Sequence, residues 1–301
     1  MMINQSIFES AVLALIGGDA EGLRSLLRQY PALVHTRSTA DHQASLFHYL
    51  GANGVENEWQ KTPPNALEMA QLLVEFGADV NALAPIYGTE DHTLELLVSS
   101  WHPFAAGLQA DLAAYMIAQG APIEGRQGNG APLGLALGFG YRNTAERLAA
   151  LGARHDNLIF AAGLGKLNSI KDMLDQQGYL KNPDLAGVMG SSEKIGRFSW
   201  PPPKHDDPRV IAFLYACLHG RDEVVLFFLD LGISPNASAS YGQTGLHFAA
   251  LAGHESTVRH LIEAGAITHL ADTQVNRSPA DWAREGGEMA IAHYLEGMST
   301  P

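Results

Sequence analysis

The sequence predicts an all-α fold built from a repeated pair of helices, and three observations lead to this prediction. The 301 residues include 31 glycines, many of which fall at regular intervals along the chain. Gly232 and Gly265 are 33 residues apart, a period typical of repeat arrays. Apolar residues make up 46% of the chain and charged residues 17%, which indicates a folded rather than a disordered protein.

The clearest unit runs from Tyr241 to Ala266. It begins with Y-G-Q-T-G-L-H-F-A-A, continues through a glycine turn at Gly253 and closes with G-A. This pattern resembles the ankyrin repeat, in which T-P-L-H-x-A-A opens a first helix, a glycine turn leads to a second helix, and G-A closes the unit. The resemblance implies an all-α ankyrin-repeat solenoid of about eight helix pairs, with short β-turn fingers and inserted loops.

The other units keep the same frame with weaker matches. They begin at L-F-H-Y (46–49), at Thr93, at A-P-L-G (131–134), at I-F-A-A (159–162) and at Y-A-C-L-H-G (215–220). We interpret residues 1–36 and 274–298 as capping repeats, and residues 1–301 as a single ankyrin-repeat domain. Because one helix pair cannot bury its apolar face alone, stacked pairs should share a continuous core.

Small residues mark the expected helix contacts. Ala249 and Ala250 follow the T-G-L-H segment, and Cys217 occupies the corresponding small-residue position one repeat earlier. We expect these side chains to let neighbouring helices approach closely, and the thiol to be an inert part of the core. The histidines of the same motif, His48 and His247, are expected to bond to turn backbone, as in the ankyrin family.

Insertions interrupt the regular spacing in three places. A regular unit has eight residues from the turn glycine to the second leucine column, but Gly54 and Leu73 are 19 apart. In the next unit Pro103 and Met116 are 13 apart, and a longer insertion occupies residues 176–206. Since insertions in repeat proteins often lie on one binding face, they predict either loops that wall a concave groove or mere surface decoration.

Composition excludes several functional classes. The formal net charge of −13 disfavours binding to nucleic-acid phosphates and to acidic membrane surfaces. The single cysteine, Cys217, rules out an internal disulfide and a multi-cysteine metal site. No apolar run reaches the roughly 18 residues of a membrane span, and we expect a cytoplasmic protein without metal or cofactor.

The candidate site residues follow from the ankyrin frame. In that family the two positions before the turn glycine face the concave groove and vary with the ligand, and aromatic side chains on loops often contact partners. The candidate binding residues are Tyr49, Asn53, Trp59, Trp101, Gln109, Trp200 and His219. His102 is the candidate for proton transfer, because an imidazole titrates near neutral pH.

Ser99 and Ser100 stand where the alanine pair is expected. Their hydroxyls could bond back to the preceding helical turn, or form a polar patch with His102 and Gln109. The first interpretation is structural and the second is functional.

The sequence is compatible with two functions of different classes. The first is a binding module whose concave groove captures a protein segment, which is what the ankyrin resemblance implies. The alternative is a cofactor-independent enzyme or binder of a small organic molecule, with a pocket around the second and third repeats. Such an enzyme would use acid–base chemistry for isomerisation, elimination or cyclisation. A pure structural spacer would leave the insertions unexplained.

Overall fold

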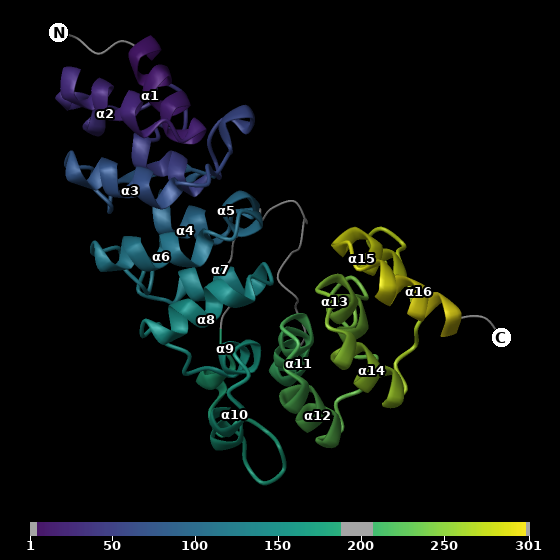
Figure 1. Ribbon diagram of the computed structural model, residues 1–301. Coiled ribbons are helices and arrows are strands. Elements are labelled where there is room, and N and C mark those ends of the chain that lie inside the picture. Colours follow the sequence, from purple (N-terminus) through teal and green to yellow (C-terminus); the bar gives the residue numbers. More distant parts are fainter. Residues whose placement is uncertain (1–4, 188–206, 299–301) are drawn as a thin grey trace. The chain divides into compact units, whose positions relative to one another are not determined.

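The computed structural model describes residues 5–187 and 207–298, and these residues form an all-α protein, as predicted (Figure 1). The described chain separates into two compact units, one ending at Arg154 and the other beginning at His155. That residues 1–301 form a single domain stays a prediction.

The first unit consists of short helices and one β-hairpin. Its elements are α1 (Gln5–Gly17), α2 (Ala20–Gln29), η1 (Pro31–His35), η2 (Leu46–Gly51), η3 (Asn57–Trp59), α3 (Ala66–Glu75), β1 (Leu83–Ile86), β2 (Thr89–His92), α4 (Thr93–Val98), α5 (Trp101–Ala105), α6 (Gln109–Ala118), α7 (Ala131–Gly138) and α8 (Arg142–Ala150). The helices pair as α1–α2, η2–α3, α4–α6 and α7–α8.

The second unit repeats this plan. Its elements are α9 (Leu158–Gly163), α10 (Leu167–Met173), η4 (Pro183–Ala186), α11 (Pro208–Leu218), α12 (Asp222–Asp230), α13 (Gly245–Leu251), α14 (Glu255–Glu263), α15 (Pro279–Gly286) and α16 (Met289–Met298). Of the inserted segment 176–206, the structure describes the part up to Gly187, which contains η4.

Within each unit, the first helices of successive pairs pack against one another in chain order. In the first unit α1 contacts η2, η2 contacts α4 and α4 contacts α7; in the second, α9 contacts α11, α11 contacts α13 and α13 contacts α15. The second helices of the first unit, α2, α3, α6 and α8, form a parallel series. Each pair therefore buries its apolar face against its neighbours, which is the solenoid principle.

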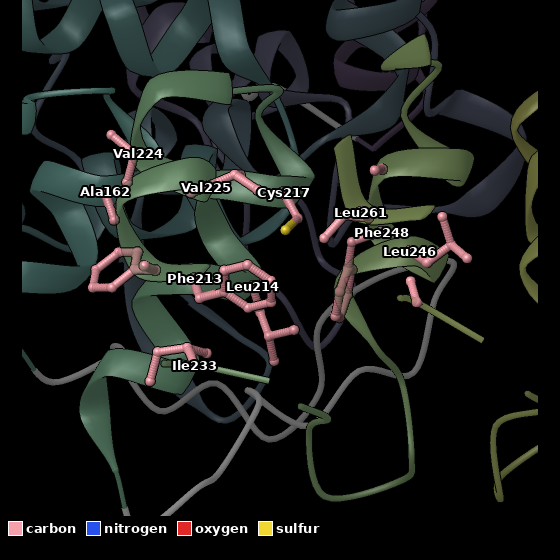
Figure 2. Packing of buried hydrophobic residues seen from close by; sticks show 14 of the residues in the cluster. Ala162, Phe213, Leu214, Cys217, Val224, Val225, Ile233, Leu246, Phe248 and Leu261 are labelled. Atoms are coloured by element: carbon pink, nitrogen blue, oxygen red, sulfur yellow. The ribbon is translucent and has the colours of Figure 1, made fainter. Parts of the chain in front are cut away.

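The small residues lie at the close helix contacts, as expected. Ala249, Ala250 and Cys217 are fully buried in the core of the second unit. Figure 2 shows Cys217 among the apolar side chains of this core. A Cβ placed on Gly245 would lie 2.7 Å from Sγ of Cys217, so the glycine lets α13 approach α11 at the position where the ankyrin motif has proline. Burial raises the pKa of the Cys217 thiol, consistent with an inert core residue.

The two motif histidines are fully buried and bond to turn residues, which confirms their structural role. The Thr244 N–H donates to Nδ1 of His247 at 3.1 Å, and Nε2 lies 3.2 Å from the carbonyl oxygen of Arg277. His48 repeats the Nδ1 contact, because the Ser45 N–H donates to its Nδ1 at 3.2 Å. Burial lowers the pKa of both imidazoles to about 4, and the nearby Arg37 charge also lowers the pKa of His48.

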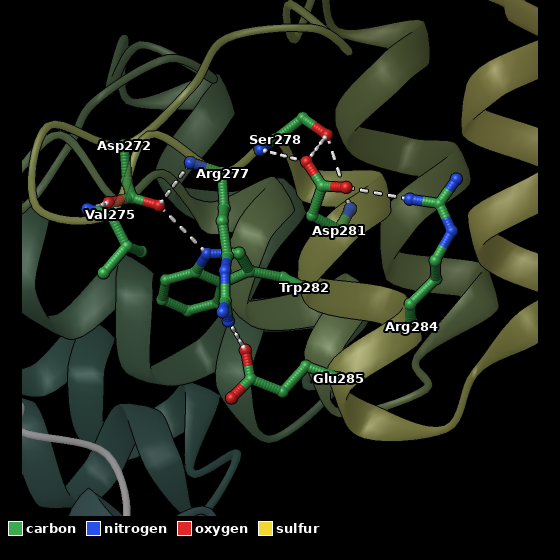
Figure 3. Close-up of polar contacts among 8 residues, drawn as sticks. All are labelled: Asp272, Val275, Arg277, Ser278, Asp281, Trp282, Arg284 and Glu285. Carbon is green, nitrogen blue, oxygen red and sulfur yellow. Dashed lines mark hydrogen bonds and ion pairs between the residues drawn. The ribbon is translucent and has the colours of Figure 1, made fainter.

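A buried carboxylate organises the last turn before α15 (Figure 3). Asp272 accepts hydrogen bonds from the backbone N–H groups of Gln274 (2.9 Å), Val275 (2.8 Å) and Arg277 (3.2 Å), and from Nε1 of Trp282 (3.1 Å). Burial alone would raise the pKa of Asp272, but these donors hold it below its usual value. The turn is thereby joined to α15, in the predicted C-terminal capping repeat.

Two features of the first unit differ from a regular repeat. The second pair begins with a 3₁₀ helix, η2, which ends at Ala52 in a left-handed conformation (φ 46°). The finger before α4 is a β-hairpin, β1–β2, in which Leu83 pairs with His92 and Ile86 with Thr89. Tyr87 and Gly88 form its two-residue turn with φ of 55° and 81°, the combination that a type I′ turn requires.

None of the described helices has the length and apolar character needed to cross a membrane.

We predict that Ala250→Leu lowers the free energy of unfolding by about 1–3 kcal/mol, because three added carbon atoms must enter a filled helix contact. Urea denaturation would measure the change. Ala264→Leu is the matched control, since Ala264 is exposed at the end of α14. An equal effect of both variants would show that Ala250 is not at a close contact.

We also predict that stability falls as the pH is lowered from about 6.5 toward 4. The unfolded chain takes up protons on His48 and His247 near pH 6.5, whereas the folded protein does so only near pH 4. The protein therefore has the full stabilising contribution of these two histidines above pH 6.5. As the pH falls through this window, each histidine lowers the free energy of unfolding by about 3 kcal/mol. Urea unfolding at several pH values should show a shallower pH dependence for His48→Gln/His247→Gln; an unchanged slope would contradict the prediction.

Candidate functional site

The first two insertions lie side by side in the first unit. One is the loop that follows η2, and the other is the short helix α5. The Asn53 amide nitrogen donates to Oγ of Ser99 at 2.9 Å, and the Ser100 hydroxyl donates to the Ala52 carbonyl at 2.9 Å. These two bonds fix the start of the inserted loop to the residues that immediately precede α5.

Asn53 also contacts the tip of the β1–β2 hairpin. The Tyr87 hydroxyl donates to Oδ1 of Asn53 at 2.5 Å. At Gly54 a Cβ would come within 2.1 Å of Cγ2 of Ile86, so the missing side chain makes room for the hairpin. Asn53, predicted to bind a ligand, therefore joins the inserted loop, the hairpin and Ser99, and it remains half-buried at the surface.

The two serines follow the structural interpretation. The Ser99 hydroxyl lies 2.9 Å from the Glu95 carbonyl oxygen and 3.0 Å from that of Leu96, one turn earlier in α4. Ser100 is buried and bonded to Ala52. Both hydroxyls are thus used to hold local structure, as back-bonding serines do.

Gln109 forms hydrogen bonds that hold three segments of the first unit together. It is almost fully buried at the start of α6. Its amide nitrogen donates to the carbonyls of Leu97 (2.8 Å) and Ser100 (2.9 Å), and its amide oxygen accepts from the Thr144 hydroxyl (2.6 Å). Both ends of the Gln109 amide therefore bind partners within the chain, and its role as a candidate binding residue stays a prediction.

Tyr49 holds the inserted loop from the interior of the first unit. Its ring is fully buried, and its hydroxyl donates to Oε2 of Glu56 at 2.9 Å. Nε2 of His42 lies 3.3 Å from the same carboxylate oxygen. Burial, together with the Glu56 charge, raises the pKa of Tyr49. Tyr49 therefore supports the site without reaching its surface.

Trp59 lies on that inserted loop, in η3, and is half-exposed. Its ring centroid is 6.1 Å from that of Tyr49. The buried tyrosine thus positions a tryptophan that solvent can reach.

Trp101 and His102 are both exposed on α5. The Trp101 side chain packs on Phe104, with ring centroids 5.6 Å apart, and Phe104 stacks on Tyr141 at 4.2 Å. Phe139 stacks on the other end of this series, 5.5 Å from Tyr141. We call these four aromatic residues the aromatic ridge; it runs from α5 to the turn between α7 and α8.

The remaining two predicted residues lie elsewhere. His219 belongs to the second unit, at the end of α11, and is fully buried rather than presented on a groove. Trp200 lies outside the described residues. The sequence analysis did not predict that Tyr141 stacks on both Phe104 and Phe139. It also did not predict that Tyr87 of the hairpin bonds to Asn53. The dipeptide Tyr-Gly between two short extended segments is the signal that could have indicated the hairpin.

No group of three or more histidine, cysteine or acidic side chains in the described ranges is arranged to hold a metal ion.

We predict that Gln109→Leu lowers the free energy of unfolding by about 2–4 kcal/mol, because two buried carbonyls and the Thr144 hydroxyl lose their partner. Thermal and urea unfolding would measure the loss. Gln71→Leu is the control, since Gln71 is exposed on α3. If Gln109→Leu unfolds like the control, the Gln109 amide does not hold these segments together.

Comparison with known proteins identifies the family of one part of the chain. A family model described as ankyrin repeats (many copies) matches residues 213–262. Inversin from Danio rerio is 44% identical over 63 residues, which is 20% of this chain and 6% of Inversin. The ankyrin repeat-containing protein P1E11.10 from Schizosaccharomyces pombe is 40% identical over 57 residues, 19% of this chain and 28% of that protein. The chain thus matches only a minor part of either relative's length.

Among solved structures, the human ASB11 ankyrin repeat domain aligns with 99% of this chain and 100% of its own, at 19% identity and a TM-score of 0.42. That likeness is too distant to carry an argument. The assignment instead rests on the matched residues 213–262, on the T-G-L-H segment with its bonded histidine, and on the stacked helix pairs. The chain is an ankyrin-repeat protein.

Proposed function

We propose that this protein is a binding module and that its first unit captures an extended protein segment. Ankyrin repeats are generally protein–protein interaction modules, which supports a protein-binding role. The observation that carries the proposal is Trp101, which is 45% exposed and contacts Phe104 of the same inserted helix, as an aromatic anchor for a partner would. Its position on an insertion adds to this support.

The proposed binding surface lies on the second to fourth helix pairs. The inserted loop with Trp59 and the helix α5 with Trp101 and His102 would wall it, and Asn53 would lie between them. The loop is held by the Tyr49–Glu56 and Asn53–Ser99 hydrogen bonds. A surface held in place in this way loses little conformational entropy on binding, which favours affinity.

The enzyme alternative receives less support from the contacts. Of the polar patch considered for acid–base chemistry, Ser99, Ser100 and Gln109 are hydrogen-bonded within the protein. Only His102 is exposed. A catalytic site needs several polar groups that converge on a reacting molecule, and these side chains converge on the backbone instead.

A peptide-display selection tests the proposal. A random peptide library is selected on the full-length protein, and the affinity of each enriched peptide is measured for wild type, Trp101→Ala and His102→Ala. We expect Trp101→Ala to weaken binding about tenfold or more, as for a buried aromatic anchor, with the melting temperature unchanged.

Leu151→Ala is the matched control, because Leu151 is also exposed in the first unit, at the end of α8. Enriched peptides that bind Trp101→Ala and wild type equally would show that the partner uses another surface. A lower melting temperature for His102→Ala without a change in affinity would make His102 a structural residue.

A further inference from the structure

We propose that the captured segment is basic and that Trp101, at the end of the aromatic ridge, stacks on an arginine side chain of that segment. The inference rests on the proposed function and specifies the partner: an extended protein segment that carries arginine.

The ridge is built so that its terminal ring is fixed in place. Tyr141 is the buried centre, stacked on Phe104 with an interplanar angle of 21° and on Phe139 with 16°. Burial raises the pKa of Tyr141, so its ring stays neutral. Trp101 joins the series through Phe104, tilted by 49°. Because its neighbours are stacked, Trp101 presents a positioned indole rather than a freely rotating one.

An exposed indole held in this way is suited to a guanidinium group. Tryptophan attracts cations over its ring face more strongly than tyrosine or phenylalanine does, and arginine adds planar stacking. The Trp101 ring contacts Phe104 at a tilt of 49°, and the 45% exposure of the side chain leaves surface for a ligand.

The unit that carries the ridge has the sign of charge that such a ligand needs. Residues 1–154 contain 15 acidic and eight basic side chains, and Arg142, the basic residue next to Tyr141, is paired with Glu146. Glu58 on the inserted loop and Asp111 in the first turn of α6 are exposed. Among the described residues neither forms an ion pair. An excess of acidic groups attracts a basic segment and repels nucleic-acid phosphates.

The second unit shows the same contact made within the chain. The Arg209 guanidinium lies 4.4 Å from the ring centroid of Tyr179, and that of Arg259 lies 4.6 Å from Tyr294. In the ranges that the structure describes, no such cation covers a ring of the aromatic ridge. A partner's arginine would complete on Trp101 an arrangement that this chain makes twice elsewhere.

The test uses the full-length protein and a short acetylated peptide that alternates glycine with arginine. Its counterpart contains citrulline, which keeps the shape of arginine without the charge. Binding is measured by titration calorimetry at pH 7.5 in low salt, and repeated in higher salt. We expect the arginine peptide to bind at least fivefold more tightly than the citrulline peptide, and to weaken as salt increases.

Variants locate the contact. Trp101→Ala should lose about threefold or more of the affinity for the arginine peptide, and Trp101→Phe should have an affinity between those of Trp101→Ala and wild type, because the phenylalanine ring attracts a cation less strongly. Glu58→Gln/Asp111→Asn should weaken binding and reduce its salt dependence, and Leu151→Ala should change nothing. Equal binding of the two peptides, or equal losses in Trp101→Ala and Leu151→Ala, would overturn the proposal.

The peptide-display selection distinguishes this inference from the proposed protein-binding function on which it rests. Enriched peptides that require Trp101 but lack arginine would leave the protein-binding function standing and overturn the basic partner. Enriched peptides that are rich in arginine and require Trp101 would support both. Enriched peptides that do not require Trp101 would contradict both.

Discussion

The close approach of successive first helices is the contact on which the rest of the structure depends. These helices are short, α13 having seven residues and α9 six, and helices of that length are unstable alone in water. They persist because small side chains such as Ala249 and Ala250, and the Cys217–Gly245 contact, allow each helix to bury its apolar face on the next. Stability is therefore a sum of neighbour contacts rather than the property of one central core.

Close stacking places a second demand on the chain, because polar groups between the helices must find partners inside. His247 and His48 each accept a hydrogen bond from a backbone N–H group of the adjacent turn. Asp272 accepts hydrogen bonds from four N–H groups. Gln109 donates hydrogen bonds to two buried backbone carbonyls. A polar residue on the inner side of a repeat is thus often part of the framework. For this reason the serine and glutamine positions near α5 do not by themselves indicate catalysis.

What distinguishes the first unit from a regular array is how its insertions are held. Tyr49 and Glu56 fix one loop from inside, Asn53 joins that loop to α4 and to the hairpin tip, and stacked rings support α5. The groups that stay exposed, Trp101 above all, sit on this supported surface. The proposed recognition of a basic segment follows from that combination: a rigid platform, an exposed indole and a surplus of carboxylates.

The sequence by itself determined the all-α class, the helix pairs and the roles of His48, His247 and Cys217, because these depend on a local pattern that recurs with the repeat. It also indicated where the insertions lie and that Trp101 and His102 stand at their edge. Only the tertiary structure decided that Gln109 and Ser100 turn inward, that Tyr87 reaches Asn53 and that Tyr141 links two turns into one ridge. The reason is physical. A repeat pattern specifies spacing along a helix, whereas the partner of a side chain on an insertion depends on a neighbouring pair dozens of residues away.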